Sequence, residues 1–189
     1  MPLILASTSV IRRQMLDAAA VDYDAVKPQV DEDELKVGLS NPSDIALRLA
    51  TAKALSVPGQ WVIGSDSVVS VEGRLFSKPR DREDAADHLR FFSGKVMQLT
   101  SAVALAHGEM LDWSHVETAT LHVRKLSDAF IADYLDAEWP EVGYTVGVFR
   151  LEGRGVQLFD RIQGDHFTIL GMPLVPLLGA LRERGLLAQ

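Results

Sequence analysis

The chain has 189 residues, of which 47% are apolar, with a formal charge of −7 and no cysteine. This length supports one sizeable hydrophobic core, so we expect a single domain over residues 1–189. The lack of cysteine excludes disulfides and thiolate metal sites and is typical of a cytoplasmic protein. The negative charge disfavours binding to duplex nucleic acid but permits a small anionic ligand in a local basic pocket.

The chain opens with the apolar run Leu3–Ala6, which we interpret as a buried first strand because no basic region precedes it. No stretch reaches the roughly 18 apolar residues that span a bilayer, so we expect no membrane segment. Ser7-Thr8-Ser9 then offers a loop and a helix cap, and Ile11, Met15 and Leu16 recur at helical spacing.

The rest of the chain alternates between helical and strand patterns, with the acidic stretch Asp31–Glu34 between two of these elements. Interleaved helices and strands indicate an α/β fold with a mixed sheet flanked by helices. The predicted helices span Pro42–Leu55, Arg82–Phe92, Ser127–Ala137 and Val175–Leu187. The predicted strands span Tyr23–Val26, Trp61–Val69, Val96–Ala106, Leu111–Arg124 and Gly155–Ile162.

Two arginines, Arg12 and Arg13, occupy the first turn of the predicted first helix. The helix dipole disfavours cations at this end, so a bound anion would resolve the conflict. Free amides at the helix start, the hydroxyls of Ser7 and Ser9 and a guanidinium together predict a phosphate cradle. The alternative is that both arginines point into solvent.

Asp66 interrupts a strand that is otherwise apolar, with Val62-Ile63 before it and Val68-Val69 after it. Burying a carboxylate without a partner costs several kcal/mol or forces protonation. A carboxylate held near a cleft is a candidate general base or metal ligand. The alternative is an aspartate in a tight turn that bonds to its own backbone.

Three further charged residues are candidates only in combination, because lysines are usually solvated and acidic runs usually exposed. Lys53 lies on a predicted helix beside small residues, Lys78 follows a strand, and Glu32 sits in the acidic stretch.

Taken together, these motifs resemble the ordered motif set of the Maf-like nucleotide pyrophosphatases, and the resemblance covers essentially the whole chain. The opening motif and the Gly-x-Asp strand are the more specific parts. The motifs are Leu5–Arg13, Val30–Glu32, Ala52–Ala54, Gly64–Ser67, Ser77–Pro79, Ser93-Gly94 and Gly171–Leu174.

The resemblance implies an elongated α/β fold with a cleft between two lobes, a divalent cation (Mg²⁺ or Mn²⁺) and a homodimer. It also implies hydrolysis of a nucleoside triphosphate to the monophosphate and pyrophosphate. Asp66 matches the family's proton acceptor, which would activate the attacking water, and is also assigned to the metal with Glu32. Arg12, Lys53 and Lys78 match the basic positions that would neutralise the triphosphate, and Ser7 matches a phosphate-binding position.

Three positions thought to tune base choice in the family appear here as Ile11, Ser67 and Glu152. Glu152 resembles the branch that acts on 7-methyl-GTP. A carboxylate can accept hydrogen bonds from the ring N–H and the amino group of guanine, which favours a purine substrate. The alternative is that Glu152 only pairs with Arg150 or Arg154.

Several positions depart from the family pattern, which leaves the substrate less defined than the reaction. A second function stays open: a regulatory nucleotide-binding protein of septum formation with little catalysis. The retained carboxylate at Asp66 favours the enzyme, since a pure binder does not need it. The departures lie at Val10, Met97, Gln163 and Thr168 and around Tyr144–Gly147.

Overall fold

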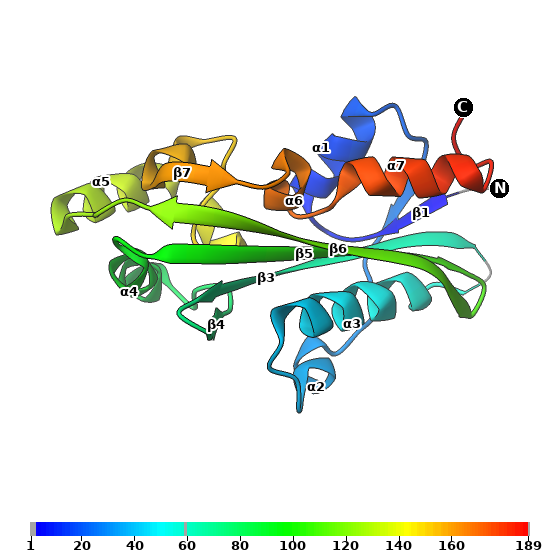
Figure 1. Ribbon diagram of the computed structural model, residues 1–189, viewed down its shortest axis with the longest axis horizontal. Helices are drawn as coiled ribbons and strands as arrows, with labels where there is room; N and C mark the ends of the chain where they lie inside the picture. The colour runs from blue at the N-terminus through cyan, green and yellow to red at the C-terminus, as the bar shows by residue number, and fades with distance from the viewer. Residues whose placement is uncertain (1–2, 59, 189) are drawn as a thin grey trace. The chain divides into compact units, whose positions relative to one another are not determined.

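A computed structural model describes residues 3–58 and 60–188. This part of the chain forms a mixed sheet of seven strands in the order β2-β1-β3-β5-β6-β7, and β4 pairs with β3 outside this path (Figure 1). The fold is therefore α/β, as predicted. The strands are β1 (Leu3–Ala6), β2 (Asp24–Val26), β3 (Trp61–Val71), β4 (Arg74–Phe76), β5 (Val96–His107), β6 (Met110–Val123) and β7 (Phe159–Gln163).

Strand β1 lies between two parallel partners, β2 and β3. Its last residue, Ala6, pairs with Gly64 of β3. Strand β3 continues to Val71, so its residues from Ser65 onward extend past the end of β1. Ligands of sheets with parallel strands commonly bind beside the carboxyl ends of those strands. This register places Ser65–Ser67 beside the loop that leaves β1.

Helices cover both faces of this part of the sheet, α1 and α7 on one face and α3 on the other (Figure 1). The helices are α1 (Val10–Ala18), α2 (Glu32–Lys36), α3 (Pro42–Leu55), α4 (Arg82–Phe92), α5 (Asp128–Glu138), α6 (His166–Leu170) and α7 (Leu174–Glu183). Two 3₁₀ helices span Glu141–Tyr144 and Arg154–Leu158.

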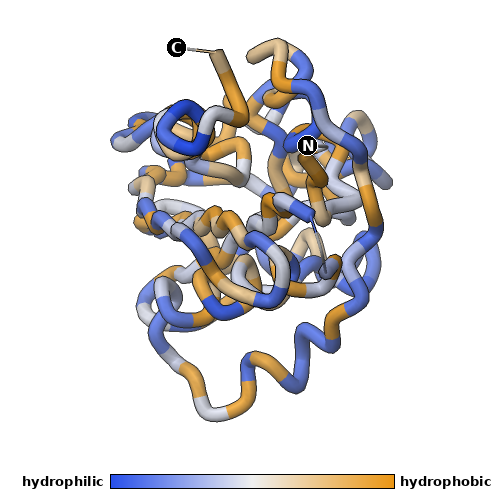
Figure 2. The backbone as a smooth tube through the Cα atoms, turned by 90° about the vertical axis from the view of Figure 1, so that its right-hand side faces the viewer, coloured by the Kyte–Doolittle hydropathy of each residue, from blue (hydrophilic) through white to orange (hydrophobic). Residues whose placement is uncertain are grey.

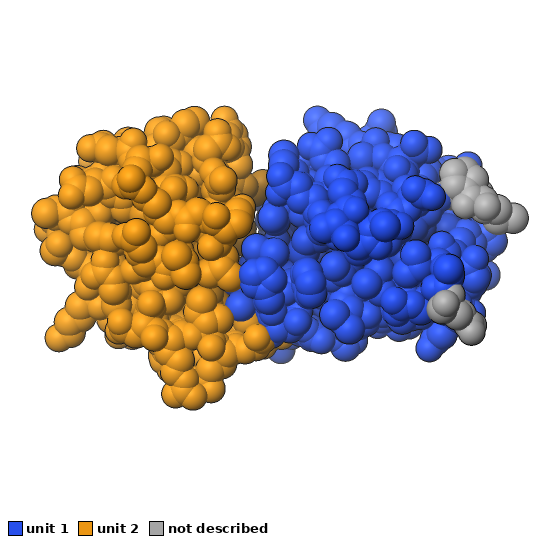
Figure 3. Space-filling view, turned by 90° about the horizontal axis from the view of Figure 1, so that it is seen from above, with its two compact units in different colours: residues 1–67, 100–117, 165–189 blue, residues 68–99, 118–164 orange. Residues whose placement is uncertain are grey.

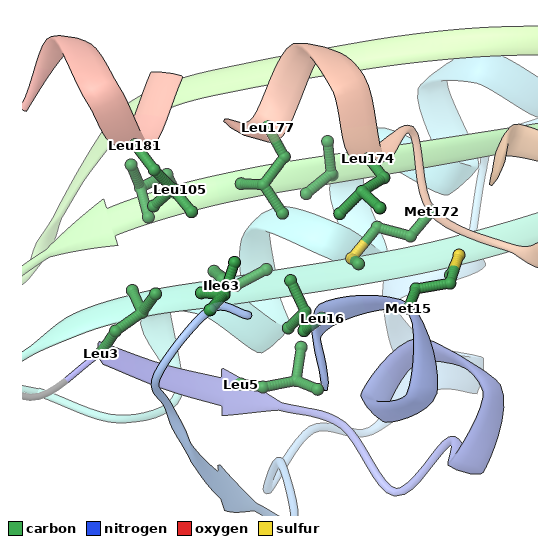
Figure 4. Packing of buried hydrophobic residues seen from close by; sticks show 12 residues of the cluster. Leu3, Leu5, Met15, Leu16, Ile63, Leu105, Met172, Leu174, Leu177 and Leu181 are labelled. Carbon is green, nitrogen blue, oxygen red and sulfur yellow. The ribbon is translucent and has the colours of Figure 1, made fainter. Parts of the chain in front are cut away.

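The main core cluster fills the space between the sheet and the helices α1 and α7 (Figure 4). Its sheet side chains alternate along each strand, as period-2 geometry requires. Ile63 points into this cluster, while its neighbour Val62 packs with Ile4 and Ala6 in a smaller cluster on the other face. The labelled members of the main cluster are Leu3, Leu5, Met15, Leu16, Ile63, Leu105, Met172, Leu174, Leu177 and Leu181.

Gly64 allows α3 to lie directly against the backbone of β3. A Cβ atom at this position would lie 2.1 Å from the Ala50 carbonyl oxygen and 2.4 Å from the Ala54 nitrogen. These distances are far below van der Waals contact, and both neighbours are backbone atoms that cannot rotate away. The glycine therefore sets the spacing between the strand and the helix.

The chain divides into two compact units, coloured separately in Figure 3. The first comprises residues 1–67, 100–117 and 165–189, and the second residues 68–99 and 118–164. Strands β3, β5 and β6 contribute residues to both units. The single domain over residues 1–189 stays a prediction.

Hydrophobic residues are scattered along the chain in short runs (Figure 2). Within the described residues, no helix is both long enough and apolar enough to cross a membrane.

The elements with strong local signals were predicted correctly. Helix α3 begins after Asn41, whose side chain accepts hydrogen bonds from the Ser43 and Asp44 amides, with Pro42 in the first turn. Helix α4 has the predicted bounds, and Ser127 caps α5 as expected.

Four predictions about elements were wrong or incomplete. Helices α2 and α6 have only five residues each and were missed. The predicted strand from Gly155 begins only at Phe159, because residues 154–158 form a 3₁₀ helix in which Gly155 packs against the Arg150 backbone. The last helix ends at Glu183, short of the predicted Leu187.

Candidate functional site

Strand β3 carries the centre of the candidate site, where it passes the end of β1. Side chains alternate between the faces of a strand. Asp66 shares a face with Gly64 and Val62, towards α3, whereas Ser65 and Ser67 share the face of Ile63, towards α1 and α7. Two sets of side chains therefore reach the same short segment of β3 from opposite faces of the sheet.

On the α3 face, the Lys53 ammonium group joins two carboxylates. Its Nζ lies 2.7 Å from Glu32 Oε1 and 3.2 Å from Asp66 Oδ2. Lys53 is buried, with only 8% of its side chain exposed, whereas 45% of the Glu32 side chain is exposed. A buried ammonium is retained only when it is paired, so the two carboxylates account for its position. The structure thus brings together three of the residues that the sequence singled out separately.

Both carboxylate oxygens of Asp66 are engaged. Oδ2 accepts a hydrogen bond from Lys53 Nζ at 3.2 Å, and Oδ1 accepts one from the Ser67 amide at 2.8 Å. The second bond is the local backbone contact that the sequence left open as an alternative. It coexists with the ion pair, and 14% of the side chain remains exposed for a ligand.

On the opposite face, Arg12 extends from α1 to β3 and to the loop before α7. Its Nε donates to the Gly171 carbonyl oxygen at 2.9 Å, and its Nη2 donates to Ser67 Oγ at 3.3 Å. The alternative in which Arg12 points only into solvent is therefore wrong. Burial lowers the pKa of the guanidinium, and the negative charges of Asp66 and Glu32 partly counteract this. The group stays charged at neutral pH because arginine titrates far above it.

The loop between β1 and α1 places Ser7 and Ser9 next to the first turn of the helix. Ser7 is buried, and its Oγ accepts the Ser9 amide at 3.1 Å. Ser9 is the N-cap residue, and its Oγ accepts the Arg12 amide at 3.4 Å. Ile11 and Arg13 are half-buried in the same turn. The predicted phosphate cradle at this helix start stays a prediction.

Gly171, in the loop between α6 and α7, has a carbonyl oxygen that contacts three side chains of the site. Its carbonyl oxygen accepts a hydrogen bond from Arg12 Nε, and it also lies within hydrogen-bond distance of Ser65 Oγ at 3.0 Å and of Ser67 Oγ at 3.1 Å. Its φ of +109° is a conformation that favours glycine. Sequence patterns cannot identify a backbone carbonyl as a hub, so this role was missed, together with those of Ser65, Ser101 and Thr168.

Gly171→Ala is expected to destabilise the protein by about 1–3 kcal/mol, because an L side chain is strained at this φ. Its Cβ would also lie 3.3 Å from Ser67 Oγ. Chemical denaturation with Gly179→Ala as the control tests this. Gly179 lies inside α7, and a Cβ added there would meet no atom within 4 Å, so the same substitution there should stabilise by about 0.5–1 kcal/mol. Equal effects of the two changes would contradict the argument.

Two predicted site residues lie in the second unit. Lys78 is exposed in the loop that follows β4. Glu152 pairs with Arg150 at 3.4 Å, as its alternative interpretation proposed, and 38% of its side chain is exposed. Its role in base selection stays a prediction.

Asp84 holds the segment just after Lys78. It accepts hydrogen bonds from the Arg80 amide and from Arg80 Nη2, both at 3.0 Å. These side-chain and backbone bonds lower the pKa of Asp84 to about 2. The segment therefore depends on the charged form of this carboxylate.

Asp84→Asn is expected to lower the free energy of unfolding by about 1 kcal/mol at neutral pH, since the Arg80 side chain is 82% exposed and the pair is screened by solvent. The folded-state pKa lies below the unfolded value of about 3.9, so this stability is complete above pH ~4 and is lost as the pH falls towards 2. Urea unfolding of both proteins from pH 2 to 7 measures the difference. A difference that does not shrink in acid would contradict the assignment.

Glu32 and Asp66 are the residues that could hold the implied divalent cation. Within residues 3–58 and 60–188, no group of three or more His, Cys, Asp or Glu side chains is arranged to hold a metal ion. Mg²⁺ is often bound through only one or two carboxylates, together with water and substrate phosphates. The oxygen donors at this site fit a cation that arrives with, and is shared by, a phosphate ligand.

The fold and the site together define an α/β protein with a charged cluster beside the carboxyl ends of parallel strands, a class that commonly binds phosphorylated ligands. The family model described as Maf-like protein matches residues 2–184. The chain belongs to this family.

Its similarity to individual proteins extends over the full length. The chain is 45% identical to the 7-methyl-GTP pyrophosphatase of Rhizobium meliloti, covering 97% of this chain and 96% of that protein. It is 44% identical to the nucleoside triphosphate pyrophosphatase of Sphingopyxis alaskensis, covering all of both. Among solved structures, the Ham1 protein of Staphylococcus aureus is 16% identical with a TM-score of 0.46, covering 68% of this chain and 73% of that one.

Proposed function

We propose that the protein hydrolyses nucleoside triphosphates to the monophosphate and pyrophosphate. The observation that carries the proposal is the buried Lys53, held between Asp66 and Glu32 beside the end of β1. The two full-length relatives above are named as pyrophosphatases of this kind. The cluster combines a carboxylate for proton transfer with cationic charge for a polyphosphate, which is what this reaction requires.

In this proposal Asp66 is the general base. It removes a proton from a water molecule, whose oxygen attacks the α-phosphorus. The bond from the α-phosphorus to the bridging oxygen breaks, and pyrophosphate leaves. Lys53 lies beside the base and stabilises the negative charge that develops on the phosphate oxygens. The buried setting strengthens this stabilisation, because the effective dielectric constant is lower than in water.

The other predicted site residues hold the substrate in this proposal. Arg12 keeps its positive charge although its two hydrogen-bond acceptors, Ser67 and Gly171, are neutral. That charge is available to a phosphate. Ser7 binds phosphate from the loop after β1, and Lys78 adds a further cation.

Glu32 and Asp66 would hold a Mg²⁺ or Mn²⁺ ion together with the substrate. The ion would supply further neutralisation of the phosphate charge. The homodimer implied by the family resemblance and the cytoplasmic location expected from the lack of cysteine belong to this proposal as well.

Within the substrate class, we infer a purine, with 7-methyl-GTP first. The support is the carboxylate of Glu152, whose acceptors match the donors of a guanine ring, and the name of the Rhizobium meliloti relative. Ile11 and Ser67 complete the proposed specificity set.

Product analysis on a panel of nucleotides tests the proposal. The purified protein is incubated with 7-methyl-GTP, GTP, dTTP, UTP or CTP and with Mg²⁺ or Mn²⁺. We expect pyrophosphate and monophosphate in equal amounts, fastest from 7-methyl-GTP, and no turnover in excess EDTA. Orthophosphate as the first product would contradict attack at the α-phosphorus. Tight nucleotide binding without turnover would favour the regulatory binding protein instead.

A further inference from the structure

A second network of hydrogen bonds runs from Arg12 through uncharged groups on the side of the sheet away from Lys53. Ser101 on β5 is fully buried, and its Oγ lies 2.8 Å from both Ser67 Oγ and the Thr168 carbonyl oxygen. Ser67 Oγ in turn accepts Arg12 Nη2 at 3.3 Å. The network thus joins β5, β3, α1 and α6 within the first unit.

The direction of these hydrogen bonds follows from the donors and acceptors available. A carbonyl oxygen can only accept, so the single proton of Ser101 goes to Thr168. Ser101 Oγ must then accept the proton of Ser67, because two oxygen lone pairs at 2.8 Å would repel each other. Ser67 Oγ is left as an acceptor, which suits the Arg12 guanidinium. The bonds therefore run in one direction, Arg12 to Ser67 to Ser101 to the Thr168 carbonyl, and each polarises the next.

The last acceptor in this series is itself fixed. Thr168 is fully buried, and its Oγ1 donates to Glu117 Oε2 at 2.5 Å. The Thr168 amide donates to Asp165 Oδ1 at 3.0 Å. Helix α6 and its C-cap residue Gly171, which present the Thr168 and Gly171 carbonyl oxygens, are held at several points and so give Arg12 a rigid support.

We propose that Ser101 is a positioning residue for Arg12: through Ser67 it fixes the rotamer in which the guanidinium faces the triphosphate. This inference rests on the proposed function only in taking a triphosphate as the ligand. Ser101 touches no substrate. Without the Ser101 hydroxyl, the Ser67 proton turns to the Gly171 carbonyl oxygen 3.1 Å away. The Ser67 oxygen that accepts Arg12 Nη2 is then no longer held by β5.

A double-mutant cycle on kcat/KM for pyrophosphate release separates positioning from a general structural role. The four proteins are the wild type, Ser101→Ala, Arg12→Lys and the double variant. Misplacing a catalytic group by about 1 Å can lower the reaction rate on the order of 100-fold. We therefore expect Ser101→Ala, made in the otherwise wild-type protein, to lower kcat/KM about 10- to 100-fold. In the Arg12→Lys background, which lacks the guanidinium fork, the same change should cost less than about threefold.

Ser70→Ala is the matched control, since Ser70 is a buried serine on β3, the strand that carries Ser67, and lies outside this network. We expect it to leave kcat/KM within about twofold of the wild type. If thermal unfolding shows that Ser101→Ala is not folded, Ser101→Cys takes its place in the cycle. Cysteine nearly keeps the side-chain volume and weakens the hydrogen bonds.

Equal losses from Ser101→Ala in both backgrounds, or no loss in a folded variant, would overturn the inference. If the wild type releases no pyrophosphate from any nucleotide, the proposed function fails, and the cycle is repeated on the dissociation constant for inorganic triphosphate. Coupling between the two positions in binding would then uphold the role of Ser101. Additive effects of the two substitutions on binding, or no binding of inorganic triphosphate by the wild type, would contradict the inference.

Discussion

Asp66→Asn is expected to abolish nearly all pyrophosphate release, with a loss of about 10²–10⁴-fold in kcat, the range attributed to a general base. The substitution preserves the shape of the side chain but removes its basicity. It also replaces one acceptor with a donor. Asp66 accepts from Lys53 on one oxygen and from the Ser67 amide on the other, so either orientation of the asparagine amide sets two donors against each other.

That mismatch predicts a cost in stability of about 1–3 kcal/mol, so kcat and thermal unfolding have to be measured on the same preparation. Asp133→Asn is the control, because Asp133 is exposed on α5 in the second unit and should behave as the wild type. A folded Asp66→Asn protein that keeps more than about a tenth of the wild-type turnover would remove Asp66 from the role of the base.

Lys53→Met is expected to have the second-largest effect, lowering kcat/KM by at least about 100-fold. The methionine side chain fills similar space without charge, so Asp66 and Glu32 would face each other without the ammonium group between them. The incoming triphosphate would meet two carboxylates with no ammonium group to offset their charge. Because one partner of a largely buried pair is removed, we also expect a loss in stability of about 1–3 kcal/mol, less than for a fully buried pair since Glu32 is half-exposed.

Lys36→Met separates the site effect from the simple loss of a lysine. Lys36 also pairs with Glu32, at 4.0 Å, but its side chain is 36% exposed and it does not contact Asp66. Exposed pairs one helical turn apart contribute less than about 0.5 kcal/mol. Turnover of Lys36→Met should therefore stay within about threefold of the wild type. Equal losses from the two substitutions would mean that net charge, rather than the position of Lys53, governs activity.

The candidate site could be predicted as a set of residues but not as an arrangement. The motifs identified Asp66, Lys53 and Glu32 individually, yet the lysine was expected to matter only in combination because lysines are usually solvated. Its burial follows from packing: α3 lies close enough to β3 for Nζ to reach both carboxylates. Such a distance between elements has no local signature in the sequence.

Secondary structure could be predicted where capping residues or apolar periodicity were strong, as at the start of α3. Helix α2 escaped prediction because it buries none of its residues and has no apolar face to reveal its period. Its first residue is Glu32, so the part of the fold with the weakest sequence signal carries one of the site carboxylates. The ion pair between Glu32 and Lys53 links α2 to α3.

The hydrogen-bond network around Arg12 could not be predicted from sequence patterns either. Its acceptors are the backbone carbonyl oxygens of Thr168 and Gly171, and every residue has such a group. The serines at positions 65 and 67 share one face of an apolar strand, which was the one available signal. It could have indicated a polar contact there but not its partner.

Gly64 has no part in binding or proton transfer, yet it determines how far Lys53 stands from Asp66. The backbone of α3 rests on the position where a side chain would be, so every other amino acid would push the helix outward and lengthen the ion pair. Position 64 therefore sets a distance in the site rather than supplying a chemical group. A side chain at position 64 would therefore leave every charged group of the site present while separating those that must act together.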